Sequence, residues 1–158
     1  DLNLYGVVGG VANEIVPGKR MLSSMTPTLL LADGKVRMIV GTPGGSTIFT
    51  SVFQTMVNRL DFNMSAVEAV SASRFHHQLL PPNVIVYSKC CTLGNESTLE
   101  ELKTLGWDVR KSSWEFGDMQ LIDVDAAGHA SAAADPRGRG VARVFDVKPA
   151  AQASRSLR

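Results

Sequence analysis

The stretch TLLLADGKVRMIV, residues 28–40, decides the fold of this sequence. Two apolar or alternating runs, residues 28–32 and 35–40, flank the dipeptide Asp33-Gly34. Asp-Gly tolerates positive φ at both centre positions of a two-residue turn, which is the turn that joins antiparallel strands. The stretch therefore predicts a β-hairpin.

A long helix is predicted directly after the hairpin. Beyond the glycine-rich segment 41–45, apolar side chains recur at helical spacing over residues 48–60, as a stripe that would pack on the sheet. Two shorter helices are indicated by capping boxes, Ser65 with Glu68 and Ser97 with Glu100. The second of these helices is expected to stop at Gly106.

Further strands are predicted in the second half of the chain. Residues 83–87 follow a Pro-Pro break, Val109 continues a strand pattern, and residues 119–124 and 128–134 form a second strand pair. The predicted fold class is therefore α+β. Residues 148–158 lack apolar periodicity and are predicted to form a mobile tail, which leaves residues 1–147 as one domain.

Composition restricts the functions that the chain can have. The 158 residues are 44% hydrophobic and 20% charged, with a net charge of +1, which fits neither a disordered chain nor a strongly basic nucleic-acid binder. No apolar run approaches the roughly 20 residues that cross a bilayer. A soluble domain with no nucleic-acid partner and no membrane span is expected.

The only two cysteines, Cys90 and Cys91, are adjacent. A disulfide between them would close a ring across a single peptide bond, far from ordinary disulfide geometry, so both are predicted to be free thiols. A vicinal redox or metal pair is the alternative, although no second cysteine pair could complete a zinc site.

The segment GTPGGS, residues 41–46, is a candidate anion-binding loop. Successive glycines let backbone N–H groups approach an anion, and the start of the following helix favours negative charge. An oxyanion hole or a phosphate cradle is built in this way, although no lysine follows the glycines as in a P-loop. A plain tight turn is the alternative interpretation.

The paired serines Ser23 and Ser24 form a second candidate site. Their hydroxyl and backbone donors could bind a carboxylate, although serine-rich loops also satisfy their own backbone. In residues 74–78, RFHHQ, the adjacent histidines would project about 100° apart on a helix, so they are interpreted as structural rather than as metal ligands. No Ser, His and acid set can be singled out by spacing as a triad.

Four motifs resemble gamma-glutamyltranspeptidases, in this order and at this spacing. They are PGKRMLSSMTPT at 17–28, GTPGGSTI at 41–48, RFHHQ at 74–78 and ADPR at 134–137, and YGVVGG at 5–10 resembles the segment that precedes them. The match covers about Leu4 to Arg137. Residues 1–147 are thus similar to the C-terminal portion of the small-subunit domain of that family.

The resemblance implies an N-terminal nucleophile hydrolase with an αββα sandwich, made as a precursor that cuts itself into a large and a small subunit. It implies γ-glutamyl transfer from, and hydrolysis of, glutathione and other γ-glutamyl compounds through an acyl-enzyme on an N-terminal threonine. By matching motif positions, Ser23 and Ser24 would bind the α-carboxylate of the glutamyl group, while the N–H groups of Gly44 and Gly45 would form the oxyanion hole. No metal or organic cofactor is implied.

The family places its catalytic threonine in a region that this sequence does not include, so the isolated chain is expected to be inactive. The implied partners are the large subunit, the upstream part of the small subunit, a γ-glutamyl substrate, an amino-acid or peptide acceptor, and water. Met21 stands where many members have Pro, and Thr47 where many have Arg.

Two alternatives remain: a related acylase acting on another γ-linked amide, and a non-catalytic binding or structural remnant. A periplasmic or extracellular location is implied by the resemblance alone.

Overall fold

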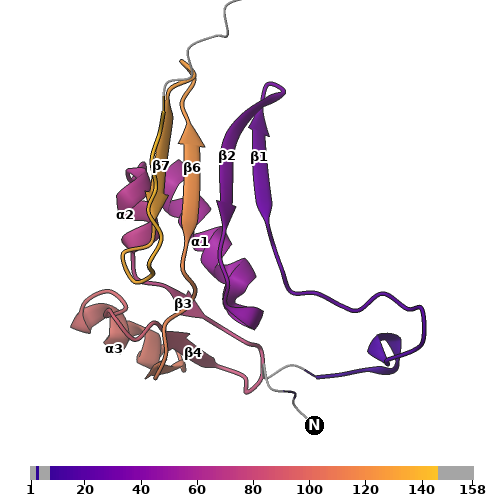
Figure 1. Cartoon of the computed structure of the whole chain (residues 1–158). Coiled ribbons are helices and arrows are strands. Elements are labelled where there is room, and N and C mark those ends of the chain that lie inside the picture. The colour runs from indigo at the N-terminus through magenta and orange to yellow at the C-terminus, as the bar shows by residue number, and fades with distance from the viewer. Residues whose placement is uncertain (1–2, 4–7, 146–158) are drawn as a thin grey trace, which may run out of the picture.

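The computed structural model describes residue 3 and residues 8–145, which form two β-sheets with three α-helices (Figure 1). One sheet has four strands in the order β1-β2-β6-β7, and the other has three in the order β3-β4-β5. The strands are β1 (Thr28–Ala32), β2 (Lys35–Gly41), β3 (Phe75–His76), β4 (Val84–Tyr87), β5 (Asp108–Lys111), β6 (Gln120–Val124) and β7 (Ala130–Ala134).

The predicted hairpin is confirmed by β1 and β2, which pair antiparallel. Asp33 and Gly34 have φ values of 50° and 74°, as the two-residue turn requires. The second predicted strand pair is confirmed by β6 and β7, which are also antiparallel. Pairing of β2 with β6, with Val40 opposite Leu121, joins the two hairpins into one sheet.

Helices α1 (Ile48–Leu60) and α2 (Ala66–Ser71) cover one face of the four-stranded sheet (Figure 1). The predicted capping box starts α2, since the Glu68 N–H donates to Ser65 Oγ at 3.3 Å and the Ser65 N–H donates to Glu68 Oε2 at 2.7 Å. The core lies between these helices and the sheet. Its buried residues are Met38, Val40, Ile48, Val52, Ala66, Ala69, Val70, Met119, Leu121 and Ala133.

The apolar stripe of α1 is only partly used in this core. Ile48 and Val52 are buried as predicted, but Phe49 and Phe53 are 50% and 65% exposed. Helix α1 thus packs on the sheet as predicted, although its apolar stripe is wider than the surface that the sheet offers.

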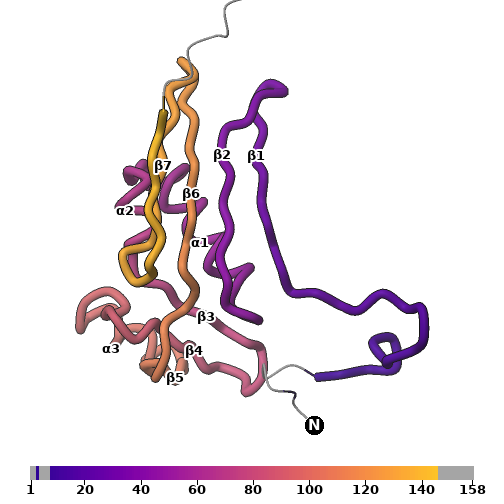
Figure 2. Tube along the Cα trace, viewed as in Figure 1, coloured from indigo at the N-terminus to yellow at the C-terminus, as the bar shows by residue number. Residues whose placement is uncertain are grey.

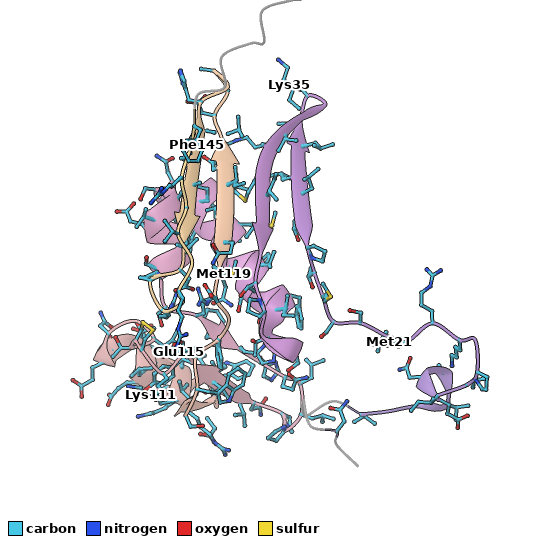
Figure 3. All side chains as sticks on the ribbon, in the orientation of Figure 1. Met21, Lys35, Lys111, Glu115, Met119 and Phe145 are labelled. Carbon is cyan, nitrogen blue, oxygen red and sulfur yellow. A yellow bond between two sulfur atoms is a disulfide. The ribbon has the colours of Figure 1, made fainter. Side chains whose placement is uncertain are left out.

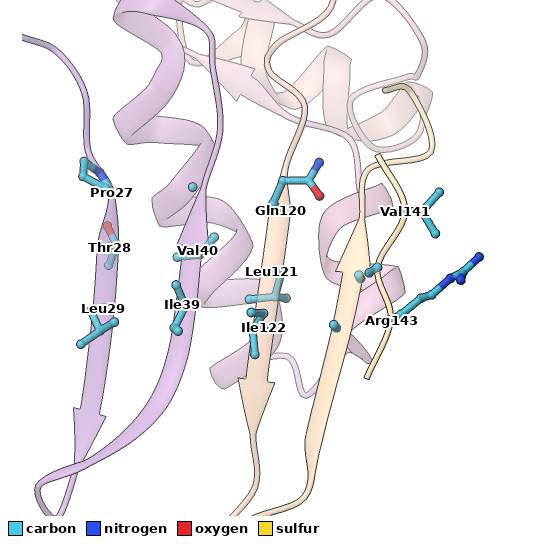
Figure 4. A pocket seen from close by; sticks show the side chains of 14 residues that line it. Pro27, Thr28, Leu29, Ile39, Val40, Gln120, Leu121, Ile122, Val141 and Arg143 are labelled. Atoms are coloured by element: carbon cyan, nitrogen blue, oxygen red, sulfur yellow. The ribbon is translucent and has the colours of Figure 1, made fainter. Parts of the chain in front are cut away.

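The opposite face of the four-stranded sheet carries no helix within residues 8–145 (Figure 1). Leu29, Ile39 and Ile122 lie opposite one another on adjacent strands and are exposed. They line a shallow hollow of about 550 Å³ (Figure 4). The sheet thus has one covered and one open apolar face.

A separate βαβ unit carries the three-stranded sheet. Helix α3 (Glu96–Thr104) connects β4 to β5, which pair parallel, and β3 pairs antiparallel with β4. The predicted capping box at Ser97 is wrong, because Asn95 caps α3 by accepting a hydrogen bond from the Thr98 N–H at 2.9 Å. Ser97 lies inside the first turn, where its hydroxyl donates to Glu101.

Two predictions in this region are corrected. Phe75-His76 is a strand, so consecutive side chains point to opposite faces instead of 100° apart on a helix. Cys90 and Cys91 are not free thiols, because they form a disulfide. Both cysteines lie in the turn and bend after β4, and residue spacing alone does not reveal that they are bonded.

Residues 8–27 run away from both sheets as an arm with one 3-10 turn, η1 (Val11–Asn13) (Figure 2). Met21 lies on this arm, whereas Lys35 lies at the tip of the first hairpin (Figure 3). Among the described residues, no helix is long and apolar enough to cross a membrane. The predicted tail, residues 148–158, lies outside the described residues.

Candidate active site

The glycine-rich loop leaves β2 at Gly41 and enters α1 through a 3-10 turn, η2 (Gly45–Thr47). Gly44 and Gly45 have φ values of 146° and 59°, which strain any residue with a side chain. A Cβ atom added at Gly44 would lie 2.9 Å from Thr47 Oγ1. The predicted strand, glycine loop and helix are present, and Gly44 has no room for a side chain.

Thr47 holds the loop from inside the molecule. This residue is buried, and its N–H and hydroxyl both donate to the carbonyl oxygen of Gly44, at 3.2 and 3.0 Å. Within the described part of the chain, the N–H groups of Gly44 and Gly45 donate no hydrogen bond. Free N–H groups at the start of a helix attract negative charge.

The segment before β6 braces the loop from the side. The Asp118 N–H donates to Thr42 Oγ1 at 2.8 Å, and this hydroxyl donates to the Pro43 carbonyl at 2.8 Å. A Cβ atom added at Gly117, where φ is 75°, would lie 2.2 Å from Thr42 Oγ1. Gly117 is therefore a structural requirement of the loop that sequence reasoning missed, since no motif marks it.

The arm returns to the loop at the paired serines, both of which are exposed. The Ser24 hydroxyl donates to the Gly45 carbonyl oxygen at 3.2 Å, while Ser23 Oγ accepts the Met25 N–H at 3.2 Å. The structure thus brings Ser24 to the glycine loop. The Ser23 hydroxyl accepts a hydrogen bond from the backbone of its own segment, as in the alternative interpretation of the serines.

The RFHHQ and ADPR motifs meet in a buried ion network behind the loop. Arg74 Nη2 lies 2.7 Å from Asp135 Oδ2, and Arg137 Nε lies 2.6 Å from Asp135 Oδ1. Arg74 Nε also donates to the Phe116 carbonyl at 2.8 Å. Because Phe116 directly precedes Gly117, this network fixes the segment that braces the glycine loop.

Electrostatics keeps the network ionised. Burial of the Asp135 carboxyl acts to raise its pKa, but hydrogen bonds from Arg137 and Arg74 outweigh burial and hold the pKa below its usual value. Burial, followed by the charge of Arg137, lowers the pKa of Arg74, although a guanidinium stays protonated in proteins. The Asp135 carboxylate thus bridges two converging arginines.

The buried His76 lies beside this network. Its Nδ1 is 2.9 Å from Thr50 Oγ1 and its Nε2 is 2.6 Å from Gln78 Oε1. Edge contacts with the rings of Phe49 and Phe116 complete its surroundings. Burial lowers the pKa of His76, which favours the neutral ring. These contacts agree with the interpretation of a structural histidine.

The described residues contain no group of three or more His, Cys, Asp or Glu side chains that could hold a metal ion. What the loop offers is two N–H donors beside the hydroxyl of Ser24. Since that hydroxyl is bonded to a carbonyl oxygen and not to a base, it is a binding group and not an activated nucleophile. The arrangement can hold an anion or polarise a carbonyl group.

A family model described as gamma-glutamyltranspeptidase matches residues 1–145. The chain belongs to the gamma-glutamyltranspeptidase family. The chain is 51% identical over 147 residues to the glutathione hydrolase proenzyme of Pseudomonas aeruginosa, covering 93% of this chain and 26% of that protein. It is 42% identical over 135 residues to the Escherichia coli protein of the same name, covering 85% of this chain and 22% of that protein. The chain spans about a quarter of the length of these relatives.

Solved structures of gamma-glutamyltranspeptidases have the same fold as this chain. The enzyme from Pseudomonas nitroreducens complexed with L-DON superposes with a TM-score of 0.85 at 46% identity, covering 92% of this chain and 75% of that chain. The T380A mutant of the Helicobacter pylori enzyme superposes with a TM-score of 0.79 at 40% identity, covering 87% of this chain and 74% of that chain. The predicted N-terminal nucleophile hydrolase fold is confirmed. Helices α1 and α2 with the four-stranded sheet form an α layer and a β layer of its αββα sandwich.

Proposed function

We propose that this chain is the part of a gamma-glutamyltransferase and glutathione hydrolase that binds the glutamyl group and stabilises the transition state. One observation carries the proposal. Among the described residues, the N–H groups of Gly44 and Gly45 donate no hydrogen bond and lie at the start of the 3-10 turn that leads into α1. The Ser24 hydroxyl is 3.2 Å from the Gly45 carbonyl oxygen. The names of the relatives, glutathione hydrolase and gamma-glutamyltranspeptidase, supply the reaction.

In the proposed reaction, a threonine from another segment of the same precursor attacks the γ-glutamyl carbonyl. Ser23 and Ser24 hold the α-carboxylate, to which the Ser24 hydroxyl turns its proton from the Gly45 carbonyl oxygen. The N–H groups of Gly44 and Gly45 hold the oxygen that becomes negative. Water or an acceptor amine then resolves the acyl-enzyme. A source of the threonine outside this chain fits relatives about four times as long.

The proposed protein partners are the large subunit and the upstream part of the small subunit. Two apolar surfaces support this assembly. The arm exposes apolar side chains such as Val11, Ile15 and Leu22, and the open sheet face exposes Leu29 and Ile39. Exposed apolar side chains that lie together on a surface mark an interaction site. No cofactor is proposed, and a periplasmic or extracellular location is proposed from the relatives.

The test compares the chain expressed alone with the chain co-expressed with the upstream segment, using release from a γ-glutamyl anilide as the assay. Only the assembled protein should cleave the γ-glutamyl anilide, because a binding loop supplies no attacking group. Turnover by the isolated chain would place the nucleophile within these residues and overturn the assignment. An assembled, folded protein that cleaves only other γ-linked amides would be a related acylase, and one that cleaves none would be a binding remnant.

A further inference from the structure

The Cys90–Cys91 disulfide takes no part in the proposed γ-glutamyl chemistry. We propose that Cys90–Cys91 is a thiol–disulfide exchange site for low-molecular-weight thiols, in which Cys90 leaves as a thiolate that Arg137 stabilises. The proposal stands independently of the proposed function, because exchange needs a thiol and not a γ-glutamyl bond.

Arg137 is held so that one of its N–H groups meets the Cys90 sulfur. Its Nε donates to Asp135 Oδ1 at 2.6 Å and its Nη2 donates to the Val70 carbonyl at 2.5 Å. The remaining Nη1 donates to Cys90 Sγ at 3.3 Å and to a second backbone carbonyl. Two anchored edges leave the guanidinium little freedom, so its charge stays beside the sulfur. A fixed cation stabilises a thiolate there.

The other polar group at this sulfur is the hydroxyl of Ser88, 3.5 Å from Cys90 Sγ. Ser88 donates its proton to the Glu115 carboxylate. Lys89 is adjacent in sequence and exposed. Among the described residues, Arg137 is thus the charged side chain that contacts the sulfur directly.

A stabilising role does not account for this disulfide. A disulfide stabilises a fold mainly by closing a long loop in the unfolded chain, and this one joins neighbouring residues. Cys90 is exposed and Cys91 is half-buried in the turn after β4, within reach of a small thiol. Exposed disulfides are the labile and regulatory ones.

The exchange proceeds in two balanced steps. A thiolate RS⁻ attacks Cys91 Sγ, a bond from RS to Cys91 forms, and the Cys90–Cys91 bond breaks with its electron pair on Cys90 Sγ. A second RS⁻ then attacks the RS sulfur of the mixed disulfide, Cys91 leaves as a thiolate, and RSSR is released. Two electrons pass to the protein, and excess RSSR drives the same steps backwards.

The test uses the protein assembled with the rest of its precursor, in buffers of graded 2-mercaptoethanol to 2-hydroxyethyl disulfide ratio. After acid quenching and alkylation with iodoacetamide, peptide masses give the fraction of Cys90–Cys91 that is doubly alkylated. This fraction should be near zero without thiol and near one in the thiol-rich buffer. Returning the protein to the disulfide-rich buffer should restore the disulfide. Because this thiol carries no γ-glutamyl group, the result is independent of enzyme activity.

The role of Arg137 is tested by Arg137→Gln, which should slow reduction several-fold because Cys90 becomes a poorer leaving group. Arg110→Gln, at an exposed arginine paired with Asp108, is the matched control and should leave the rate of reduction unchanged.

Cys91→Ser provides a second test, which does not depend on whether the Arg137→Gln protein folds. It leaves Cys90 as a single thiol, whose pKa from pH-dependent alkylation should lie below the ordinary value of about 8.5.

Three outcomes would overturn the proposal. One is a pair isolated as thiols without reductant, and another is a pair that stays oxidised in the thiol-rich buffer. The third is an ordinary or raised pKa for Cys90 in the Cys91→Ser protein.

Discussion

Arg74 and Asp135 form an ion pair at 2.7 Å between side chains that are only 1% and 0% exposed. The pair joins two motifs that lie 61 positions apart in the chain. Through the Phe116 carbonyl it also reaches the segment against which the glycine loop rests. In this structure both motifs therefore act on the position of the loop.

Removing one partner of this pair should be strongly destabilising. In Arg74→Met, the Asp135 carboxylate stays buried and is left with Arg137 as a charged partner. The loss of unfolding free energy should therefore lie near the lower end of the about 3–5 kcal/mol that breaking a buried pair costs. Denaturant unfolding of the assembled protein measures the loss. The matched control is Arg110→Met, at an exposed arginine, which should leave the unfolding midpoint unchanged. Equal losses in the two variants would contradict the role of the buried pair.

Stability should fall on mild acidification through His76. Burial lowers the pKa of this ring in the folded protein, so the unfolded chain takes up a proton at a higher pH. The contribution of His76 to the free energy of unfolding is complete above the pKa of histidine in the unfolded chain, about 6.5. This contribution is lost as the pH falls through that value toward the lower pKa of the folded protein.

His76→Gln should reduce the difference between urea midpoints at pH 7.5 and pH 5.5. An undiminished difference in a folded His76→Gln protein would refute the assignment.

The proposed oxyanion hole predicts a loss in kcat for Gly44→Ala. The added Cβ would meet Thr47 Oγ1 at 2.9 Å and would force the loop out of place. Loss of one such donor costs on the order of 10²- to 10³-fold in kcat. Gly41→Ala is the control, because an added Cβ there has no atom within 4 Å. Steady-state kinetics on a γ-glutamyl anilide measure kcat for both variants. Equal kcat values would show that the N–H groups do not stabilise the transition state.

The two serines should differ in their kinetic effects. Ser23→Ala should raise KM and spare kcat, because a carboxylate is equally charged in substrate and transition state. Ser24→Ala should raise KM and also lower kcat, since this hydroxyl is bonded to the Gly45 carbonyl. One lost hydrogen bond to a charged group sets the scale at about 1.5–3 kcal/mol. An unaltered KM in both variants would make the serines structural.

Features with a local cause could be predicted from the sequence. Asp33-Gly34 determines its hairpin because the turn needs two residues at positive φ, and the Ser65 box needs only residues of its own helix. The order of β-strand, glycine loop and helix around Gly44 follows from the same short-range rules. Matching motifs to a known family then suggested chemistry that geometry alone would leave open.

Features that depend on distant partners could not be predicted. Gly117 matters only because Thr42 lies against it, and no pattern near either residue reveals this contact. The cap at Asn95 was missed because Ser97 offers the same local signal two positions later. The disulfide at Cys90 depends on the direction of a turn, which composition does not determine.

The central strand pairing has a consequence for the order of folding. Val40 and Leu121 are paired neighbours although about 80 positions separate them, whereas each hairpin is local. Bringing such distant strands together costs loop-closure entropy that the hairpins avoid. Thr42 and Asp118 flank this junction, so their hydrogen bond forms only after the hairpins have met. We therefore expect the glycine-rich loop to reach its final position late in folding, so that a partly folded chain does not yet offer the proposed site.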